Sequence, residues 1–257
     1  MIESAWWWPV ASQSDDLSKP QAVSLLGRSL VLWQAQDLTV SLFNDRCPHR
    51  GAQLSLGQVR GDALQCPYHG WQFGAQGQCQ HIPSQPDFVP PASAAVRSHP
   101  LQSAHGLWWA SLDGNAQHPL PELSALPGRR LVYGPFDVAT SAPRAVENFL
   151  DTSHFAFVHE GWLGDARHPE VPAHEMTWSP DGRPMVEHYL AWQPRASATA
   201  SQGAWVTYRY EVLSPYAALL SKRSDSEGPE DSYVIWACPQ TAESCRLWFA
   251  QYTTDQV

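Results

Sequence analysis

Basic residues are scarce in this sequence of 257 residues. Lys and Arg together number 16 against 25 Asp and Glu, which gives a formal net charge of −9. Proteins that bind nucleic acid usually carry basic patches that neutralise phosphates, so this charge balance argues against nucleic acid as a partner. An acidic surface instead suits docking to a basic patch on another protein.

Long hydrophobic runs and export signals are also lacking. The N-terminal stretch has an acidic residue at Glu3 and no basic residue before Lys19, and its only apolar run is interrupted by Pro9. A signal peptide needs a basic start and an apolar core, and a membrane-spanning helix needs about 20 apolar residues. We therefore expect no membrane contact and a cytoplasmic protein.

The chain contains only five cysteines, an odd number for a disulfide framework. Without an export signal, this count favours a reducing compartment. Two of the five nevertheless lie in a regular arrangement. Cys47-x-His49 and Cys66-x₂-His69 each combine a cysteine with a histidine, and a proline follows each cysteine. A disulfide, a zinc site and an iron–sulfur cluster are the three candidate explanations.

The mixed composition of the two pairs favours iron–sulfur, with zinc as the alternative. Zinc sites usually pair Cys with Cys and His with His, as C-x₂-C and H-x₃₋₅-H. A Rieske [2Fe–2S] centre instead binds two thiolates at one iron and two imidazoles at the other. Two facing loops supply these ligands if each contributes one thiolate and one imidazole. Gly51 and Gly70, close behind the histidines, suit tight loops of this kind.

These residues resemble the Rieske non-haem iron oxygenases. CPHRG…CPYHGWQF matches the cluster-binding pattern of that family, and WWWPVA and LVLWQAQDLTVSLFNDRCPHRGAQLSLG resemble its N-terminal strands. The resemblance implies that Cys47, His49, Cys66 and His69 bind a Rieske [2Fe–2S] cluster. The other three cysteines have no place in the pattern.

Turn residues and prolines divide the chain into two parts. Short strands separated by turns between 23 and 112 predict a small antiparallel β-domain, and the proline-rich stretch 82–100 is expected to be extended and irregular. A second proline-rich stretch is interpreted as a linker. We therefore expect a Rieske domain over 1–118, a linker over 119–130 and a catalytic domain over 131–257.

The second part predicts helices and a broader sheet. The stretch 144–160 is the best helix candidate, and 205–213, 232–238 and 245–254 are rich in β-branched and aromatic residues that are typical of strands. The expected fold class is α+β: an N-terminal Rieske antiparallel β-domain followed by an incomplete catalytic domain with a curved antiparallel sheet and helices.

The candidate helix carries the pattern N-x₂-D-x₂-H-x₄-H, formed by Asn148, Asp151, His154 and His159. The same pattern occurs in the family's catalytic domain. The resemblance implies that both histidines bind a mononuclear Fe(II), and that Asp151 is a catalytic residue linking this iron to the cluster of a neighbouring subunit. His154 and His159 are five residues apart, which places them about 140° apart around a regular helix, so they could not bind one ion from a straight helix. We therefore predict that the helix ends or forms a π-bulge near Phe155–Val158. An amphipathic helix with two partly buried histidines is the alternative.

A 2-His-1-carboxylate site also needs an acidic ligand. In the family it is an Asp on a helix after the last large strand, a context that the later acidic residues of this sequence do not match. The residues compared with it are Asp225, Glu227, Glu230, Asp231 and Asp255. The third ligand is left unassigned, and the chain is interpreted as C-terminally truncated, either naturally or as a fragment.

The resemblance is to the single-subunit type, as in vanillate O-demethylase and toluenesulfonate methyl-monooxygenase. It implies the iron–sulfur oxygenase subunit of a two-component aromatic monooxygenase or demethylase in aromatic hydrocarbon catabolism. An NADH-dependent flavin and iron–sulfur reductase would supply electrons, and O₂ would oxidise an aryl methyl, methoxy or ring position. A homo-oligomer, a trimer, is implied as well. The alternative is a truncated, catalytically inactive Rieske electron carrier.

The sequence leaves the substrate open, and an aryl sulfonate such as toluenesulfonate is one possibility. Five arginines of the second part are candidate partners for a carboxylate or sulfonate, although arginines are usually solvated surface residues. They are Arg144, Arg167, Arg183, Arg195 and Arg209.

Overall fold

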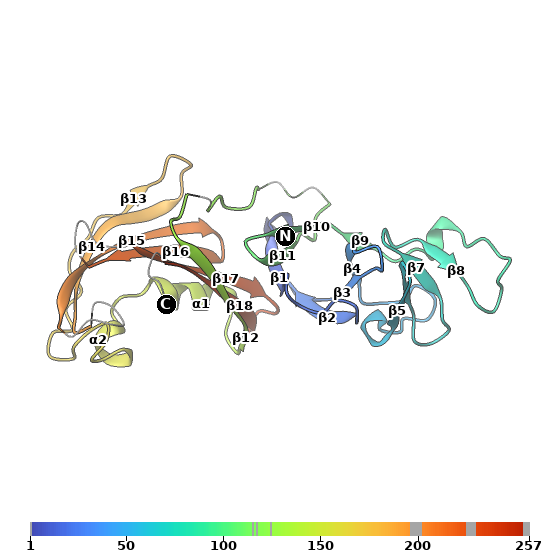
Figure 1. Cartoon of the computed structure of the whole chain (residues 1–257), viewed down its shortest axis with the longest axis horizontal. Helices are drawn as coiled ribbons and strands as arrows, with labels where there is room; N and C mark the ends of the chain where they lie inside the picture. The colour runs from blue at the N-terminus through green and yellow to red at the C-terminus, as the bar shows by residue number, and fades with distance from the viewer. Residues whose placement is uncertain are drawn as a thin grey trace. The chain divides into compact units, whose positions relative to one another are not determined.

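The computed structural model describes residues 2–114, 116, 118–123, 125–195, 202–224 and 230–253. The chain divides into two compact units (Figure 1). The first unit comprises Met1–Leu120 and Cys238–Ser244, and the second comprises Pro121–Ala237 and Cys245–Val257. The turn Cys238–Ser244, expected in the catalytic domain, thus groups with the first unit, and regular structure in the second unit begins at Arg129, within the expected linker.

Antiparallel sheets build the described part of the first unit. One sheet has the order β1-β11-β10, a second β2-β3-β4-β9 and a third β5-β6-β7-β8. The strands are β1 (Trp8–Ser12), β2 (Gln21–Leu25), β3 (Arg28–Gln34), β4 (Val40–Asn44), β5 (Gln58–Arg60), β6 (Ala63–Gln65), β7 (Gln72–Gly74), β8 (Cys79–His81), β9 (Ser98–His99), β10 (Leu101–Ala104) and β11 (Leu107–Ala110). Short 3₁₀ helices are η1 (Ile2–Ala5), η2 (Leu54–Leu56) and η3 (Ala92–Ala94). The proline-rich stretch is largely irregular, as expected, but it contains η3 and β9.

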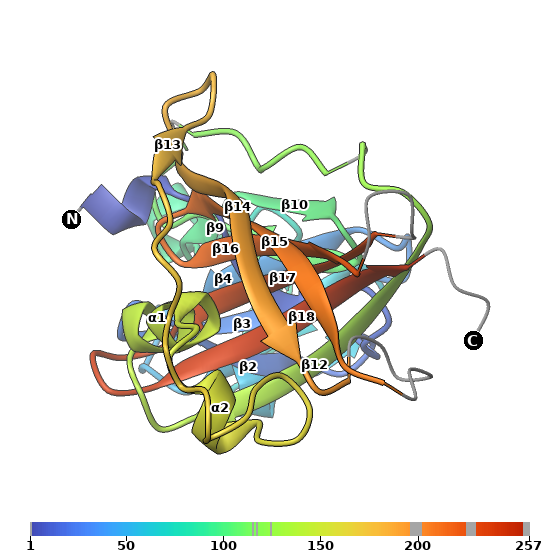
Figure 2. The same cartoon turned by 90° about the vertical axis from the view of Figure 1, so that its left-hand side faces the viewer.

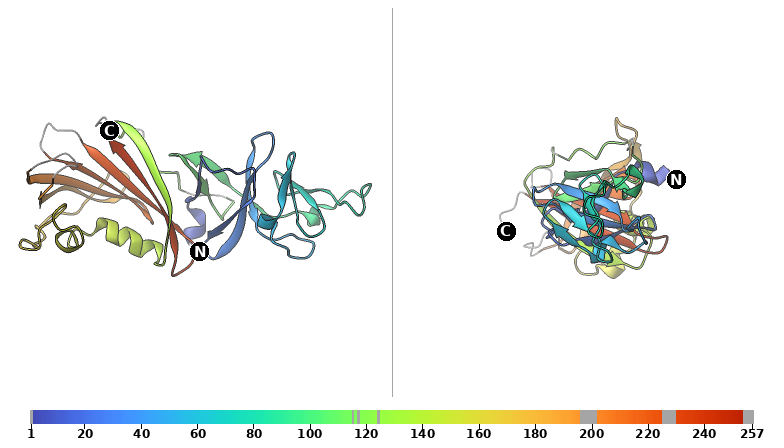
Figure 3. Two further views of the ribbon diagram at one scale, coloured as in Figure 1. Left: turned by 60° about the horizontal axis from the view of Figure 1, so that its bottom comes forward. Right: turned by 90° about the vertical axis from the view of Figure 1, so that its right-hand side faces the viewer.

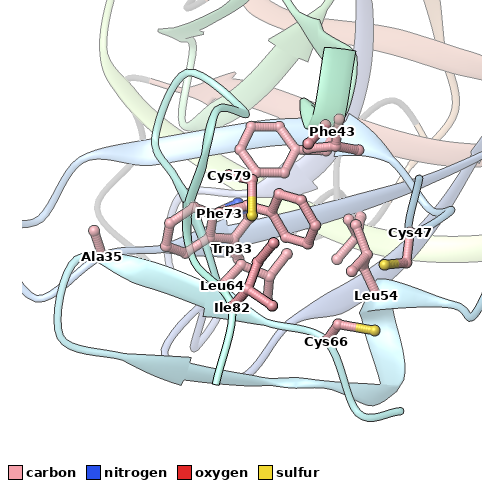
Figure 4. Close-up of a cluster of buried hydrophobic side chains, with 13 residues drawn as sticks. Trp33, Ala35, Phe43, Cys47, Leu54, Leu64, Cys66, Phe73, Cys79 and Ile82 are labelled. Atoms are coloured by element: carbon pink, nitrogen blue, oxygen red, sulfur yellow. The ribbon is translucent and has the colours of Figure 1, made fainter. Parts of the chain in front are cut away.

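Local sequence explains the central hairpin of this unit. Leu26 and Gly27 connect β2 to β3 with φ angles of 50° and 73°. Positive φ at both central residues matches the twist of the flanking strands in a two-residue hairpin turn. Leu30–Trp33 of β3 is completely buried, because both faces of this strand are covered. The core around it is a cluster of buried aromatic and aliphatic side chains (Figure 4).

A seven-stranded sheet forms the described part of the second unit. Its order is β12-β18-β17-β16-β15-β14-β13. The strands are β12 (Arg129–Val138), β13 (Thr177–Trp178), β14 (Pro184–Gln193), β15 (Ala204–Ser214), β16 (Ala217–Arg223), β17 (Asp231–Pro239) and β18 (Cys245–Thr253). The three predicted strands correspond to β15, β17 and β18. β14 was not predicted, because a bulge between Val186 and Tyr189 breaks its alternation of buried and exposed residues.

Two short helices lie on one face of this sheet in the described residues (Figures 2 and 3): α1 (Ala142–Leu150) and α2 (Phe155–Val158). The prediction of one helix over 144–160 that ends or bulges near Phe155–Val158 was wrong. α1 already ends at Leu150, because Asp151 adopts an extended conformation and accepts hydrogen bonds from the backbone and hydroxyl of Ser153. No helix in the described part of the chain is long and apolar enough to cross a membrane.

Candidate iron–sulfur and iron sites

Two loops of the first unit hold the first set of candidate ligands, and their backbones are closed in the same way. The Cys47 amide donates to the carbonyl of Ala52 (2.8 Å), and the Gly51 amide donates to that of Cys47 (2.9 Å). In the second loop the Cys66 amide donates to Trp71 (2.8 Å) and the Gly70 amide to Cys66 (3.1 Å). The two short cysteine–histidine motifs thus fold into equivalent loops.

The glycines are required by these loops. Gly51 and Gly70 have φ angles of 76° and 72°, a region that other residues rarely adopt. A Cβ atom would lie 3.1 Å from the Arg46 guanidinium at Gly51, and 3.0 Å from the ring of Pro83 at Gly70. Because both contacts are tight, a side chain at either position would strain its loop.

The loops bring the four predicted ligands together. Cys47 and Cys66 are buried beside Leu54 (Figure 4), and the rings of His49 and His69 have centroids 4.6 Å apart. Burial raises the pKa of the Cys47 thiol to about 11, and its interaction with the Cys66 thiol adds to this rise. All five cysteines of the chain have free thiols, which argues against the disulfide explanation.

The donor set fits a Rieske cluster. Nδ1 of His49 is buried without a hydrogen-bond partner among the described residues, as expected of a nitrogen reserved for a metal. The described residues contain no group of three or more Cys, His, Asp or Glu placed around one ion. A Rieske centre needs only two protein ligands at each iron, and this is what two thiols and two imidazoles supply.

Aromatic side chains cover both imidazoles. The Trp71 ring stacks on His49 with centroids 4.5 Å apart and an angle of 5° between the planes. The Tyr68 ring lies over His69 at 3.9 Å. Their roles were not predicted, although both belong to the quoted motif, because a sequence does not say which ring faces which.

The second set of candidate ligands lies around α2. His154 precedes this helix and His159 follows it, and their ring centroids are 5.1 Å apart. Nδ1 of His154 lies 3.1 Å from Oδ2 of Asp151. Hydrogen bonds from Ser153 hold the pKa of Asp151 below its usual value, so this carboxyl group is ionised at neutral pH. Burial lowers the pKa of His159, which favours the neutral imidazole that metal binding requires.

The remaining candidate residues do not join this pair of histidines. Asn148 lies on α1 and lines a separate cavity with Phe149 and Phe249. Glu230 forms an ion pair with Arg223 at 2.9 Å. Asp231 begins β17, while Asp225, Glu227 and Asp255 lie outside the described residues. The described residues thus supply two of the three protein ligands that a mononuclear iron site of this type needs.

Two cavities are lined by residues that contact the histidine pair. Phe155 connects the pair to the sheet, because its ring centroid lies 5.2 Å from that of His154 and 6.0 Å from that of Tyr208. The first cavity has a volume of about 350 Å³ and is lined by Asp151 and mainly apolar residues. The second, of about 480 Å³, is lined by Phe155 and by Trp192 and Trp205, and is called the tryptophan cavity below.

Both cavities have the size of small-ligand sites, which are usually roughly 300–1,000 Å³. Thr152, Val171 and Tyr189 line both of them. These residues were not identified from the sequence, since they come from the unpredicted strand β14 and from irregular segments.

Comparison with protein families identifies both units. The Rieske [2Fe-2S] domain family matches residues 7–100, and the vanillate O-demethylase oxygenase C-terminal domain family matches residues 138–256. The two matches cover the cysteine–histidine loops and the histidine pair, respectively. The expected order of a Rieske domain followed by an oxygenase domain is confirmed.

Individual relatives agree with this assignment. Methylxanthine N1-demethylase NdmA of Pseudomonas putida is 33% identical over 97% of this chain and 73% of its own length. Methylxanthine N3-demethylase NdmB of the same organism is 33% identical over 88% of this chain and 65% of its own length. The structure of Pseudomonas putida NdmA with caffeine superposes with a TM-score of 0.81 at 31% identity, covering 99% of this chain and 76% of that one. The chain therefore belongs to the Rieske non-haem iron oxygenases, enzymes whose oxygenase component carries a Rieske [2Fe–2S] cluster and a mononuclear Fe(II).

Proposed function

We propose that this chain acts as the oxygenase component of a two-component monooxygenase or demethylase that oxidises a methyl group of a small aromatic compound. The observation that carries the proposal is the pair His154 and His159, oriented by Asp151 and connected through Phe155 to an aromatic cavity. NdmA and NdmB, which are named as N-demethylases, support an N-methyl substrate, and O-methyl substrates are chemically analogous.

We assign the cluster to Cys47, His49, Cys66 and His69. When bound, the cluster supplies single electrons to the second site. The protein residues hold it in place: the buried thiols give one pair of ligands, and the two imidazoles, whose rings meet edge to face, give the other. The backbone loops keep these donors at fixed positions. Fixed ligands allow the cluster to gain or lose an electron with little change in structure.

We assign the mononuclear Fe(II) to His154 and His159, and its chemistry is the activation of O₂. The Asp151 carboxylate only accepts hydrogen bonds, so His154 carries its proton on Nδ1 and leaves the lone pair of Nε2 for the metal. Asp151 thus fixes both the tautomer and the ring plane of His154. Its link to the cluster of a neighbouring subunit is part of this proposal.

The tryptophan cavity is the proposed substrate site. Phe155 lies against both histidines and forms one of the walls of the cavity, so this wall is the side nearest the histidine pair, and the proposal places the methyl group of a bound ring there. Apolar and aromatic walls bind a planar ring and exclude water. Demethylation then converts the N- or O-methyl compound, O₂, NADH and a proton to the demethylated compound, formaldehyde, water and NAD⁺.

The proposal includes two kinds of partner. An NADH-dependent flavin and iron–sulfur reductase supplies the electrons, and a second copy of this chain, in a cyclic trimer, brings a cluster close to Asp151. A head-to-tail contact of this type closes into a ring. The cytoplasmic location expected from the sequence stays a prediction.

The test is product formation. Purified protein with a reconstituted cluster is supplied with Fe(II), a reductase, NADH, O₂ and N-methyl, O-methyl and sulfonate-bearing aromatic compounds, and formaldehyde is measured. Formaldehyde in proportion to NADH supports the proposal. Reduction of the cluster without product from any compound would instead favour the alternative of an electron carrier.

A further inference from the structure

The tryptophan cavity has an aromatic wall that is open to a ligand. Trp192 of β14 and Trp205 of β15 are directly opposite in the sheet register, with ring centroids 5.9 Å apart at an angle of 69°. Their exposed fractions are 42% and 55%. Large exposed indoles bind flat rings well, and their faces also attract cations.

The ionisable residues in the lining are two acidic residues, Asp165 and Glu170, and one histidine, His168. The Arg167 guanidinium neutralises Asp165 through Nε–Oδ1 and Nη2–Oδ2 contacts of 3.0 Å and 2.5 Å, and it lowers the pKa of Asp165 to about 2. Glu170 is exposed and forms no ion pair with any residue that the structure describes. The lining therefore carries uncompensated negative charge at Glu170.

The nearby arginines are occupied elsewhere. Arg183 and Arg209 each lie 2.6 Å from a different oxygen of Glu211. Arg195 lies over the ring of Trp162, 4.7 Å from its centroid. In the described part of the chain no Lys or Arg lines the tryptophan cavity, and the residues outside that part include neither type.

We infer that the tryptophan cavity selects neutral or cationic aromatic rings and rejects rings that carry a carboxylate or sulfonate; this inference rests on the proposed function of the cavity. An anionic group would face Glu170 without a fixed cation to compensate it, whereas an ammonium group is attracted by Glu170 and by the indole faces. Comparing binding without and with Fe(II) separates the charge of the lining from the positive charge at the histidine pair.

The experiment uses three ligands that share one ring and one methoxy group. They are 4-methoxybenzamide, which is neutral, 4-methoxybenzylammonium, which is cationic, and 4-methoxybenzoate, which is anionic. Binding to the full chain with its cluster is measured by calorimetry, both without and with Fe(II). We expect the amide and the ammonium compound to bind at least about tenfold more tightly than the benzoate in both states.

Variants assign the effect to the cavity. Glu170→Gln is expected to narrow the difference between the benzoate and the amide, and Glu170→Arg to reverse it. Glu175→Gln makes the same change of charge at an exposed residue outside the lining and is expected to leave the order unchanged. Because both positions are exposed, these variants are expected to fold.

The outcomes separate this inference from the proposed function. Benzoate binding as tight as that of the amide would overturn the inference, whether or not formaldehyde is formed, and so would the absence of binding by all three ligands. The expected order of affinities without formaldehyde from any ligand would leave the selectivity of the cavity standing and count against the proposed oxygenase activity.

Discussion

The imidazole of His49 lies flat against the indole of Trp71, with ring centroids 4.5 Å apart and the planes within 5° of parallel. Trp71 itself packs on the buried core of the first unit. This contact fixes the plane of His49 and keeps water from one face of a proposed cluster ligand. Trp71 is therefore a positioning residue for the cluster.

Replacing Trp71 by Ala is expected to raise the reduction potential of the reconstituted cluster. The reduced cluster carries one more negative charge than the oxidised one, and water that reaches His49 stabilises the more charged form. A tenfold change in the reduction equilibrium corresponds to about 59 mV. Spectroelectrochemical titration measures the shift, and Trp71→Phe, which keeps an aromatic cover, is expected to restore most of the original potential. An unchanged potential in the alanine variant would contradict this role.

The cysteines of the first unit provide a second prediction. Cys47→Ala or Cys66→Ala is expected to abolish cluster assembly, because each removes a proposed thiolate ligand. Cys79 is buried in the same core cluster but lies on β8 outside the two loops, so Cys79→Ala is the matched control and is expected to retain the cluster. Iron and acid-labile sulfide contents and the visible spectrum measure assembly. Bound zinc without acid-labile sulfide in the unmodified protein would instead support the zinc explanation.

The two cysteine–histidine loops could be predicted because their chemistry is local. Spacing, proline and glycine already specify each loop, and the two loops form equivalent hydrogen bonds around Cys47 and Cys66. The helix around the histidine pair was harder to predict, because α1 ends where the side chain of Asp151 accepts a hydrogen bond from the backbone amide of Ser153. The helical spacing of apolar residues in the sequence does not reveal that a side chain will take over such a backbone hydrogen bond and end the helix.

The tryptophan cavity could not be predicted from the sequence at all. It forms where β14 and β15 pair, and the register that places Trp192 opposite Trp205 is a long-range property of the sheet. The bulge next to Tyr189 also removes the alternation by which a strand is usually recognised. Local patterns thus predicted the ligands, whereas the shape of the site depends on tertiary pairing.

Asp151→Asn is expected to weaken Fe(II) binding at the second site by roughly 10–100-fold, as loss of a carboxylate partner of a ligating histidine usually does. An amide can donate to His154 as well as accept from it, so the tautomer with a free Nε2 is no longer enforced. Calorimetry with Fe(II) under anaerobic conditions measures the affinity. Ser153→Ala is the control, because it removes a hydroxyl bond to Asp151 (2.7 Å) and leaves the bond to His154. Equal affinities of the Asn variant and the unmodified protein would argue against the positioning role.

His99 is expected to make the stability of the first unit depend on pH. It is 7% exposed, and its Nε2 lies 2.8 Å from Oδ1 of Asn44. Burial, together with the positive charges of Arg97 and Arg28, lowers the pKa of His99 to about 4. In the unfolded chain a histidine titrates near 6.5. Between these values the unfolded state binds more protons than the folded state, so the free energy of unfolding rises with pH.

We therefore expect the stabilising contribution of neutral His99 to be complete above about pH 6.5 and to be lost as the pH falls through about 4, at a cost of about 3 kcal/mol. His99→Gln keeps a hydrogen-bonding side chain but does not titrate, so its free energy of unfolding should depend less on pH. Denaturant unfolding of both proteins at several pH values between 7 and 5, followed by fluorescence, measures the difference between the two slopes. Other titrating groups are common to both proteins and cancel in this difference. Parallel curves for the two proteins would mean that His99 is protonated in the folded state at the same pH as in the unfolded chain.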